Sequence, residues 1–302
     1  MEVTTVNTMN YRAFIKVVEL GSITKAANEL DYSQPGVSHM LNTLEDEVGF
    51  PLIIRSRDAI IPTEDGKKLL PYCQQIVRSE DAFYNTISSI NGIMTGSIKI
   101  GAFNSLLISC IPQLVTRFAK LYPKVEIQLL EKAYLDMQTS LLNGSIDAAF
   151  TSDEIPKGFE FYHLFSVPVG VIMHCDHPLA TYEKVPIQML NGQELIMPGH
   201  GWDDIYNMVQ EKQSFTPVAK HYVASDNAVF NMVSDDFGMY IISKLQLPQL
   251  PKNVVFREFK EDIQRNLGIC VKSLKQSSPT LKEFVRFSIE FLSKEGKEDV
   301  SS

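Results

Sequence analysis

Apolar residues in the first 50 positions recur at intervals of three and four, the period of helices that bury one face. The first run, at residues 11–18, predicts an amphipathic helix that ends at Gly21. Ala26, Ala27 and Leu30 continue the pattern and predict a second, shorter helix. Its small alanines allow another helix to cross it closely.

A third helix follows, and its ends carry residues that satisfy free backbone groups. Ser33 is expected to cap its N-terminus, Pro35 fits its first turn, and Gly49 fits the position just after its end. Asp31 lies at the turn between the two short helices, and aspartate tolerates a left-handed backbone. Two short helices around a tight turn are the layout of a DNA-reading helix-turn-helix, here over residues 23–42.

The outward face of the third helix is short and polar. We expect Gln34, Ser38 and His39 to read bases on this face. Downstream, two short β-prone runs surround Arg55 and Arg57, which predicts a hairpin wing. Two guanidiniums near its tip suit contacts to phosphate or to the minor groove.

A further apolar stripe begins at Thr63 and extends over roughly seven turns, which predicts a long helix. A helix of that length must bury its stripe, either against a second copy of the chain or against its own C-terminal domain. The run Asn-Gly-Ile-Met-Thr-Gly-Ser at residues 91–97 predicts a hinge after it.

Strand and helix patterns alternate beyond this hinge. Strands are expected at residues 97–103, 125–131 and 146–151, separated by helices at 106–121 and before Gly144. This order predicts a mostly parallel sheet covered by helices on both faces. A second α/β set follows, after which residues 267–271 and 280–292 are expected to return to the first sheet. The pattern therefore predicts two α/β lobes.

Ligands of open α/β sheets bind where strands end and helices begin. Four such places offer hydroxyls, amides or free backbone N–H groups that suit a small polar or anionic metabolite. They supply the candidate effector-binding residues Asn104, Ser105, Thr151, Ser152, Gly199, His200, Ser225 and Asp226. Ordinary helix capping explains any one of them, whereas the converging set favours a ligand site.

The length of 302 residues suggests two or more domains, and the formal net charge is −8. Within residues 10–64, five basic residues face eight acidic ones. This charge gives no support to nucleic-acid binding, which usually needs a basic face. Phosphate contacts would therefore depend on backbone N–H groups, helix N-termini and oligomerisation.

Metal, redox and catalytic chemistry have little support in the sequence. The four cysteines are widely spaced without a CxxC pair, so we expect reduced thiols. His174-Cys175-Asp176-His177 offers metal ligands, but adjacent ligands do not readily close on one tetrahedral ion. No catalytic motif occurs, and we expect no enzymatic activity, no metal and no cofactor. Without a signal pattern or an apolar run of about 18 residues, we expect a cytoplasmic protein and no membrane partner.

Several separated segments resemble the N-terminal domain of LysR-type transcriptional regulators. They are Gly-Ser-Ile-Thr-Lys-Ala-Ala at 21–27, Ser-Gln-Pro-Gly-Val-Ser at 33–38, Leu44-Glu45, Arg55, and Thr-Glu-Asp-Gly at 63–66. The resemblance implies a winged helix-turn-helix, a linker helix that pairs two subunits, and a two-lobed periplasmic-binding-protein-like effector domain. It also implies a tetramer on double-stranded DNA. The family often has Arg where His39 stands, so the base read at that position is expected to differ.

We interpret the chain as a DNA-binding transcriptional regulator of LysR type, an α/β protein controlled by a small-molecule effector bound between two lobes. The expected DNA contacts are Ser33, Gln34, Pro35, Ser38, His39, Arg55 and Arg57. The expected domains are a DNA-binding domain (7–64), a linker and dimerisation helix (65–94) and an effector domain (95–296), with lobe 1 at about 97–163 and 267–296 and lobe 2 at about 164–266.

Two alternatives compete with this interpretation, the first from another class of protein. A solute-binding protein would share the C-terminal architecture, but it predicts a signal peptide and no helix-turn-helix. A redox or metal sensor would keep the same DNA-binding architecture and replace the effector with oxidation or metal binding.

Overall fold

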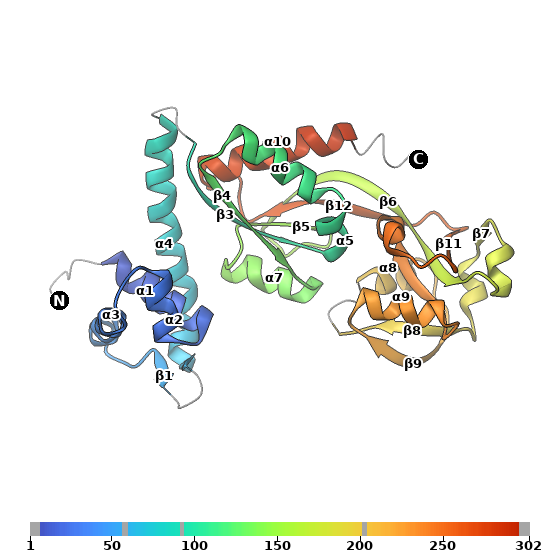
Figure 1. Cartoon of the computed structure of the whole chain (residues 1–302), viewed down its shortest axis with the longest axis horizontal. Helices are drawn as coiled ribbons and strands as arrows, with labels where there is room; N and C mark the ends of the chain where they lie inside the picture. The colour runs from blue at the N-terminus through green and yellow to red at the C-terminus, as the bar shows by residue number, and fades with distance from the viewer. Residues whose placement is uncertain (1–6, 56–59, 91–93, 201–203, 296–302) are drawn as a thin grey trace. The chain divides into compact units, whose positions relative to one another are not determined.

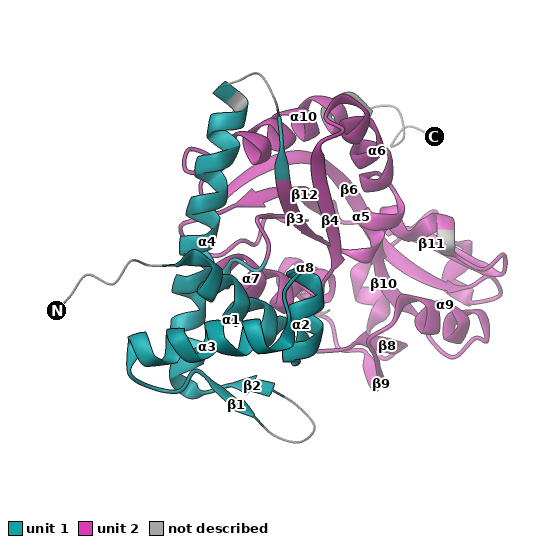
Figure 2. Cartoon of the chain, turned by 60° about the vertical axis from the view of Figure 1, so that its left-hand side comes forward, with its two compact units in different colours: residues 1–96, 143–145 teal, residues 97–142, 146–302 magenta. Residues whose placement is uncertain are grey.

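The computed structural model describes residues 7–55, 60–90, 94–200 and 204–295, and the chain forms two compact units (Figure 2). The first unit comprises residues 1–96 and 143–145, and the second comprises residues 97–142 and 146–302. Arg57 at the predicted wing tip and much of the predicted hinge lie outside the described residues.

The first unit contains a group of packed helices with a short hairpin at its edge (Figure 1). Its elements are α1 (Thr8–Leu20), α2 (Ile23–Glu29), α3 (Gln34–Val48), β1 (Ile53–Arg55), β2 (Ile60–Pro62) and α4 (Glu64–Ile90). β1 and β2 pair antiparallel. The three predicted helices, the hairpin and the long helix are thus all present.

Local backbone chemistry determines where these helices begin and end. The Ser22 hydroxyl accepts a hydrogen bond from the backbone N–H of Lys25, and the Ser33 hydroxyl accepts one from that of Gly36, at 3.2 Å. Asp31 adopts a left-handed backbone with φ of 59°, which turns the chain from α2 into α3. The predicted caps and turn are confirmed.

The core of this unit is formed by the apolar faces of α1, α2 and α3. Phe14, Val37 and Leu41 are fully buried, and Ala27 is 1% exposed. An alanine at the α2–α3 crossing leaves room for the second helix to approach, as its size predicts. The fixed angle between α2 and α3 is what presents the polar face of α3 outward.

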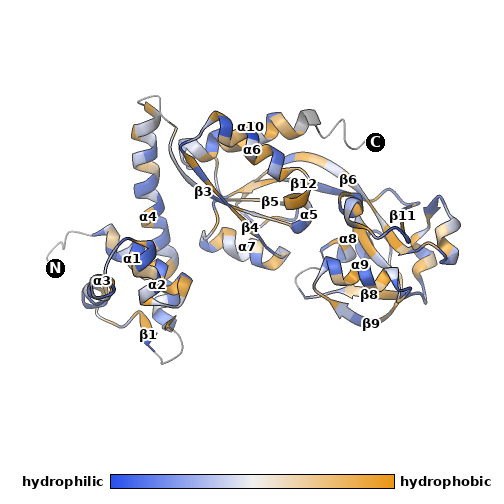
Figure 3. Cartoon of the chain, viewed as in Figure 1, coloured by the Kyte–Doolittle hydropathy of each residue, from blue (hydrophilic) through white to orange (hydrophobic). Residues whose placement is uncertain are grey.

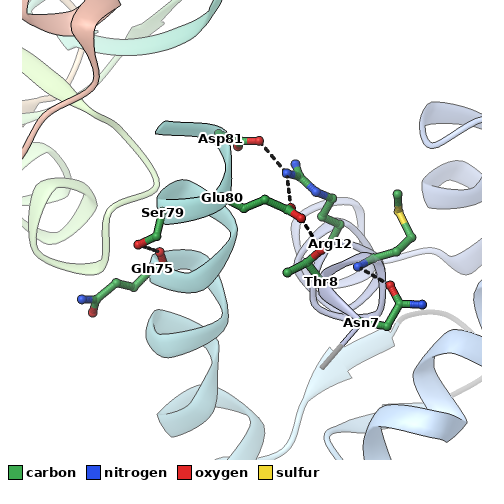
Figure 4. A network of polar contacts seen from close by, with 8 residues as sticks. Asn7, Thr8, Arg12, Gln75, Ser79, Glu80 and Asp81 are labelled. Carbon is green, nitrogen blue, oxygen red and sulfur yellow. Dashed lines mark hydrogen bonds and ion pairs between the residues drawn. The ribbon is translucent and has the colours of Figure 1, made fainter. Parts of the chain in front are cut away.

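A polar network ties α1 to α4 (Figure 4). Arg12 on α1 donates to Glu80 at 2.9 Å and also pairs with Asp81, while the Thr8 hydroxyl donates to Glu80 at 2.7 Å. Asn7 caps α1 by accepting from the backbone N–H of Met9. α1 is therefore held to the long helix by charge as well as by apolar packing.

The second unit is a two-lobed α/β domain (Figure 1). Lobe 1 contains β3 (Gly96–Ala102), α5 (Asn104–Ile108), α6 (Ile111–Leu121), β4 (Val125–Glu131), α7 (Tyr134–Asn143), β5 (Ala148–Ser152), β12 (Gln264–Val271) and α10 (Pro279–Glu295). Lobe 2 contains β7 (Lys184–Val185), β8 (Glu194–Pro198), α8 (Asp204–Lys212), β9 (Val218–Val223), α9 (Asp226–Ser234), β10 (Tyr240–Ser243) and β11 (Val254–Phe259), with 3-10 turns at Pro178–Thr181, Ile187–Leu190 and Lys244–Gln249.

One long strand, β6 (Glu160–His174), belongs to both lobes. Its first half pairs with β12, and its second half pairs with β10 and β11, in a sheet of order β4-β3-β5-β12-β6-β11-β7. The second half of β6 and the end of β12 are apolar (Figure 3) and mostly buried. β8 and β9 form a separate parallel pair.

Two sequence-based expectations for this unit were wrong in detail. The sheet is mixed: β3 and β5 are parallel, but β12 runs antiparallel to both β5 and β6, because the chain re-enters lobe 1 from lobe 2. The single helix expected at 106–121 is two helices, α5 and α6. Pro112 has no N–H for the hydrogen bond that would join them, and the Ser109 hydroxyl bonds back to the Ser105 carbonyl.

Among the described helices, none combines the length and apolar content needed to cross a bilayer.

Candidate DNA-reading face and effector pocket

The N-terminal half of α3 presents the predicted base-reading side chains. Gln34 and His39 are exposed and Ser38 is half-buried, while Val37 between them points into the core. Ser33 and Pro35 are also exposed, in the cap and first turn of the helix. The structure therefore brings these five predicted residues together at one helix end, whose partial positive charge favours phosphate.

Gln34 is oriented by its neighbour one turn later. Its side-chain amide donates to the Ser38 hydroxyl at 3.3 Å, so the amide oxygen and the second N–H remain free. A glutamine held in this way can offer one donor and one acceptor to a base edge, the pattern that adenine matches in the major groove.

The wing strand is joined to α3 by a contact that the sequence analysis missed. The guanidinium of Arg55, at the end of β1, donates to the Asn42 side chain at 2.9 Å. In the sequence, Asn42 is only one more outward position of α3. Because Asn42 fixes one side of the guanidinium, the remaining N–H groups of Arg55 are positioned beside the reading helix.

Several acidic side chains of the first unit have basic or backbone partners. Lys16 pairs with Glu19 and Glu29 at 3.2 and 3.1 Å, and Glu45 accepts hydrogen bonds from the backbone N–H groups of Leu52 and Ile53 at the start of β1. Lys25 is exposed in the first turn of α2 and forms no ion pair with any described residue. It is therefore a further candidate for contact with phosphate, which the net charge of the unit does not indicate.

The long helix α4 carries an uncovered apolar stripe. Phe83 is 61% exposed and Ile90 is 80% exposed, and Ile76 and Ile87 lie on the same stripe at helical spacing. An adjoining side of its first half is covered, since Cys73 and Val77 belong to the core of the first unit.

The second unit contains a pocket between its two lobes, with about 600 Å³ of space not occupied by protein atoms, its open mouth included. It is lined by Phe103, Asn104, Ser105, Tyr134, Leu195, Ile196, Pro198, Asp204, Ile205, Tyr206, Asp226, Tyr240, Ile241, Gln246 and Arg265. Apolar walls with a few polar groups are typical of small-molecule sites.

The predicted effector residues divide into two groups. Asn104, Ser105 and Asp226 line the pocket. Five others are not among its lining residues: Thr151, Ser152, Gly199, His200 and Ser225. Thr151 and Ser152 are buried in β5, and His200 and Ser225 are exposed. Gly199 has a packing role, because a Cβ at this position would lie 2.5 Å from that of Ala224.

A buried ion pair that the sequence analysis missed lines the pocket. Arg265 on β12 pairs with Asp204 at the start of α8, and their side chains are only 5% and 10% exposed. The guanidinium also lies 4.5 Å from the centre of the Phe103 ring. Arg265 lies near the start of β12, where this strand crosses from lobe 2 into lobe 1, and α8 belongs to lobe 2. The pair therefore ties the crossover strand to a helix of lobe 2 at the pocket.

Asp226 lies at the first turn of α9 and faces the same pocket. Its carboxylate accepts a hydrogen bond from the buried Gln246 amide at 3.1 Å. Burial, together with the nearby charges of Glu131 and Asp204, raises the pKa of Asp226. Burial likewise raises the pKa of Tyr240, whose phenol therefore stays protonated as a neutral donor.

The cysteines and the candidate metal ligands lie elsewhere in the chain. Burial raises the pKa of Cys73 to about 11 and that of Cys270 to about 12, which keeps both thiols protonated. His174, Cys175 and Asp176 each offer one possible ligand atom, and these atoms lie within 4.8 Å of one another. The His174 ring nitrogen Nδ1 accepts the backbone N–H of Asp176 at 3.3 Å, and Cys175 and Asp176 are exposed.

Comparisons with known proteins agree with this architecture. A Bacillus subtilis protein described as an uncharacterized HTH-type transcriptional regulator, YvbU, is 27% identical over 290 residues, covering 94% of this chain and 98% of its own length. The structure of a full-length OxyR variant from Pseudomonas aeruginosa has a TM-score of 0.76 at 21% identity and covers 95% of each chain. Full-length CbnR in complex with its target DNA has a TM-score of 0.65 at 19% identity, covering 94% of this chain and 99% of CbnR.

Two family models match consecutive parts of the sequence. Residues 9–67 match the bacterial regulatory helix-turn-helix protein of the lysR family, and residues 92–293 match the LysR substrate binding domain. The first match contains the reading helix and the wing, and the second contains both lobes and the pocket. The chain therefore belongs to the LysR family of transcriptional regulators, which are regulators and not enzymes.

Proposed function

We propose that this regulator reads its operator with the N-terminal half of α3 and binds a small-molecule effector in the pocket between its lobes. The observation that carries the DNA proposal is the outward polar group of the exposed Gln34 and His39 and the half-buried Ser38, on a helix end whose other face is buried. Gln34 and His39 contact base edges, Ser33 and Pro35 position the helix, and Arg55 contacts the DNA backbone. Arg57, outside the described residues, is proposed for the same role.

The chain acts as a homodimer through α4, with a tetramer as the form on DNA. The support is the uncovered stripe of Phe83, Ile87 and Ile90, which a second copy of the helix would bury. Two copies present two reading helices, so the operator would contain two half-sites related by symmetry. The CbnR complex is a precedent for DNA binding by a protein of similar fold.

Effector binding alters DNA binding through the two lobes. The pocket is lined by residues of both lobes and by the ion pair between Arg265, on the crossover strand, and Asp204, so a ligand bound there would favour one lobe arrangement over another. The coupling is reciprocal. If the ligand changes the affinity of the protein for DNA by some factor, DNA changes the affinity of the protein for the ligand by the same factor.

Selection of duplexes from a random library by the full-length protein tests the DNA proposal. We expect enrichment of an inverted repeat whose half-sites are separated by about one or two helical turns of 10–10.5 base pairs. Failure to enrich any sequence over repeated rounds would contradict it.

A redox sensor is the second candidate, since a protein of similar fold, OxyR from Corynebacterium glutamicum, is described in a form with hydrogen peroxide bound. The elevated pKa values of Cys73 and Cys270 argue against those two thiols, which leaves the half-buried Cys110 and the exposed Cys175. Measurements of operator binding with and without hydrogen peroxide distinguish a redox sensor from a sensor of a small-molecule effector. They compare the wild type with the double variant Cys110→Ser, Cys175→Ser. The effector proposal expects no effect of peroxide that depends on these thiols.

A further inference from the structure

The charges that line the effector pocket do not balance. Its lining contains two carboxylates, Asp204 and Asp226, and among the described residues one cation, Arg265. Glu131, near enough to raise the pKa of Asp226, adds further negative potential. The described pocket is therefore net negative before any ligand enters.

The only described cation of the pocket is already paired. Arg265 is 4% exposed, its ion pair with Asp204 is buried, and its guanidinium lies over the Phe103 ring. Asp204 already neutralises the charge of Arg265, so a purely anionic ligand finds no uncompensated cation in the described lining. Displacing Asp204 would leave one charge of a buried pair uncompensated. This arrangement disfavours the anionic metabolite that the sequence analysis allowed.

Asp226, in contrast, forms no ion pair with the described residues. Its carboxylate is hydrogen-bonded by the Gln246 amide, which is itself held by the backbone N–H of Ser243 at its oxygen. Gln246 is 6% exposed, so it presents a fixed donor on one side of the carboxylate. The other lone pairs of the carboxylate are available to a ligand.

A second polar atom of the pocket also has no protein partner. The Nε–H of Arg265 is buried and forms no hydrogen bond with the described residues. A buried donor without an acceptor is uncommon and is satisfied by a ligand or by water. A ligand with a donor or a positive charge at Asp226 and an acceptor at Arg265 would supply the missing partners of the carboxylate and of the Nε–H.

We infer that the effector is a small molecule with a protonated amine, bound by the Asp226 carboxylate, and with an oxygen acceptor that reaches Arg265. This inference rests on the proposed function, because it assumes that the pocket is the effector site. The aromatic lining, with Tyr134, Tyr206 and Tyr240, suits an ammonium group, since ring faces attract cations.

Three probes with the same four-carbon chain test the charge assignment. Putrescine carries two ammonium groups, 4-aminobutanoate carries one together with a carboxylate, and succinate carries two carboxylates. The melting temperature of the full-length protein is measured with each probe at 10 mM, pH 7.5 and constant ionic strength. We expect both amines to raise it, the aminobutanoate more, and succinate to leave it unchanged.

Two variants locate the binding. Asp226→Asn keeps the size of the side chain and an acceptor for Gln246, and it should weaken amine binding at least tenfold by calorimetry. Asp235→Asn makes the same change at an exposed position just after α9, and it should leave amine binding as in the wild type.

The outcomes separate the inference from the proposed function. If succinate binds and Asp226→Asn strengthens its binding, the pocket is an effector site but the amine inference is wrong. If neither amine changes the wild-type melting temperature, or if both variants bind amines equally, the inference is also overturned. None of these results bears on whether the protein selects an operator, which is measured separately.

Discussion

At the scale of single residues, the ionised carboxylate of Asp226 lowers the free energy of unfolding, because it is buried in the folded chain. Its pKa is raised above the ordinary value of 3.8, first by burial, so the folded state binds a proton more readily than the unfolded state does. Below the unfolded pKa both states are protonated and no penalty applies. The penalty grows as the pH rises through the folded pKa and is complete above it.

Asp226→Asn should therefore raise the free energy of unfolding at pH 7.5, and the gain should shrink as the pH falls toward 4. Urea denaturation of both proteins across this range measures the difference. The position at the start of α9 offsets part of the cost, because a helix N-terminus favours a carboxylate. A variant that is less stable than the wild type at pH 7.5, with no dependence on pH, would contradict this account.

The sequence could predict some of these residues and not others. Asp226 was predicted because it follows a strand and starts a helix, and Asp31 because few residue types tolerate its backbone. Arg265 and Asp204 were missed because they are 61 positions apart and meet only when the chain folds. The sequence did contain a signal for Arg265: it lies two positions before the expected apolar strand at 267–271, and a charge buried with such a strand needs a partner.

At the scale of elements, the N-terminal cap of α3 is the feature that prepares the reading helix. Ser33→Ala removes the acceptor for the Gly36 N–H and should destabilise the first unit by about 1 kcal/mol. Ser79→Ala is the matched control, since this hydroxyl bonds back to the Gln75 carbonyl within α4 (Figure 4), and alanine is the better helix former.

Chemical denaturation of the three proteins, followed by far-ultraviolet circular dichroism, compares these substitutions. Equal stability of Ser33→Ala and Ser79→Ala would show that the cap contributes nothing measurable.

Periodicity predicted most elements of the chain, and the errors have local causes. It failed at the α5–α6 break, where the apolar pattern continues through residues that the backbone cannot keep in one helix. It did not identify β7 or β11. β7 is two residues long, and β11 is a mostly half-buried strand whose pairing with β6 and β7 depends on distant chain segments.

At the scale of the whole molecule, the proposed pairing of two reading helices depends on self-association through α4. Phe83→Glu places a charge in the exposed stripe and should raise the dimer dissociation constant at least tenfold, because an unpaired charge would be buried in the interface. Tyr182→Glu, at an exposed aromatic position just after a 3-10 turn of lobe 2, is the control. Light scattering across a dilution series measures the mass of each protein, and an unchanged mass for Phe83→Glu would contradict dimerisation through this face.

The domain architecture was predictable because it depends on short-range patterns, whereas the properties of the pocket were not. The pattern of helices, caps and strands predicted a winged helix-turn-helix followed by two lobes, and the family matches agree. The pocket combines residues from α5, α7, β8, α8, α9, β10, the 3-10 turn Lys244–Gln249 and β12, and its charge balance depends on which of them become buried together.

The central claim is that α3 reads bases, and the affinity for two duplexes tests it most directly. Fluorescence anisotropy at one salt concentration measures binding of the full-length protein to its selected operator and to a scrambled duplex of equal length. Gln34→Ala and His39→Ala should each lose affinity for the operator, by about 1–3 kcal/mol per base contact, and keep the wild-type affinity for the scrambled duplex. Equal losses on both duplexes, or no loss on the operator, would contradict base reading by α3.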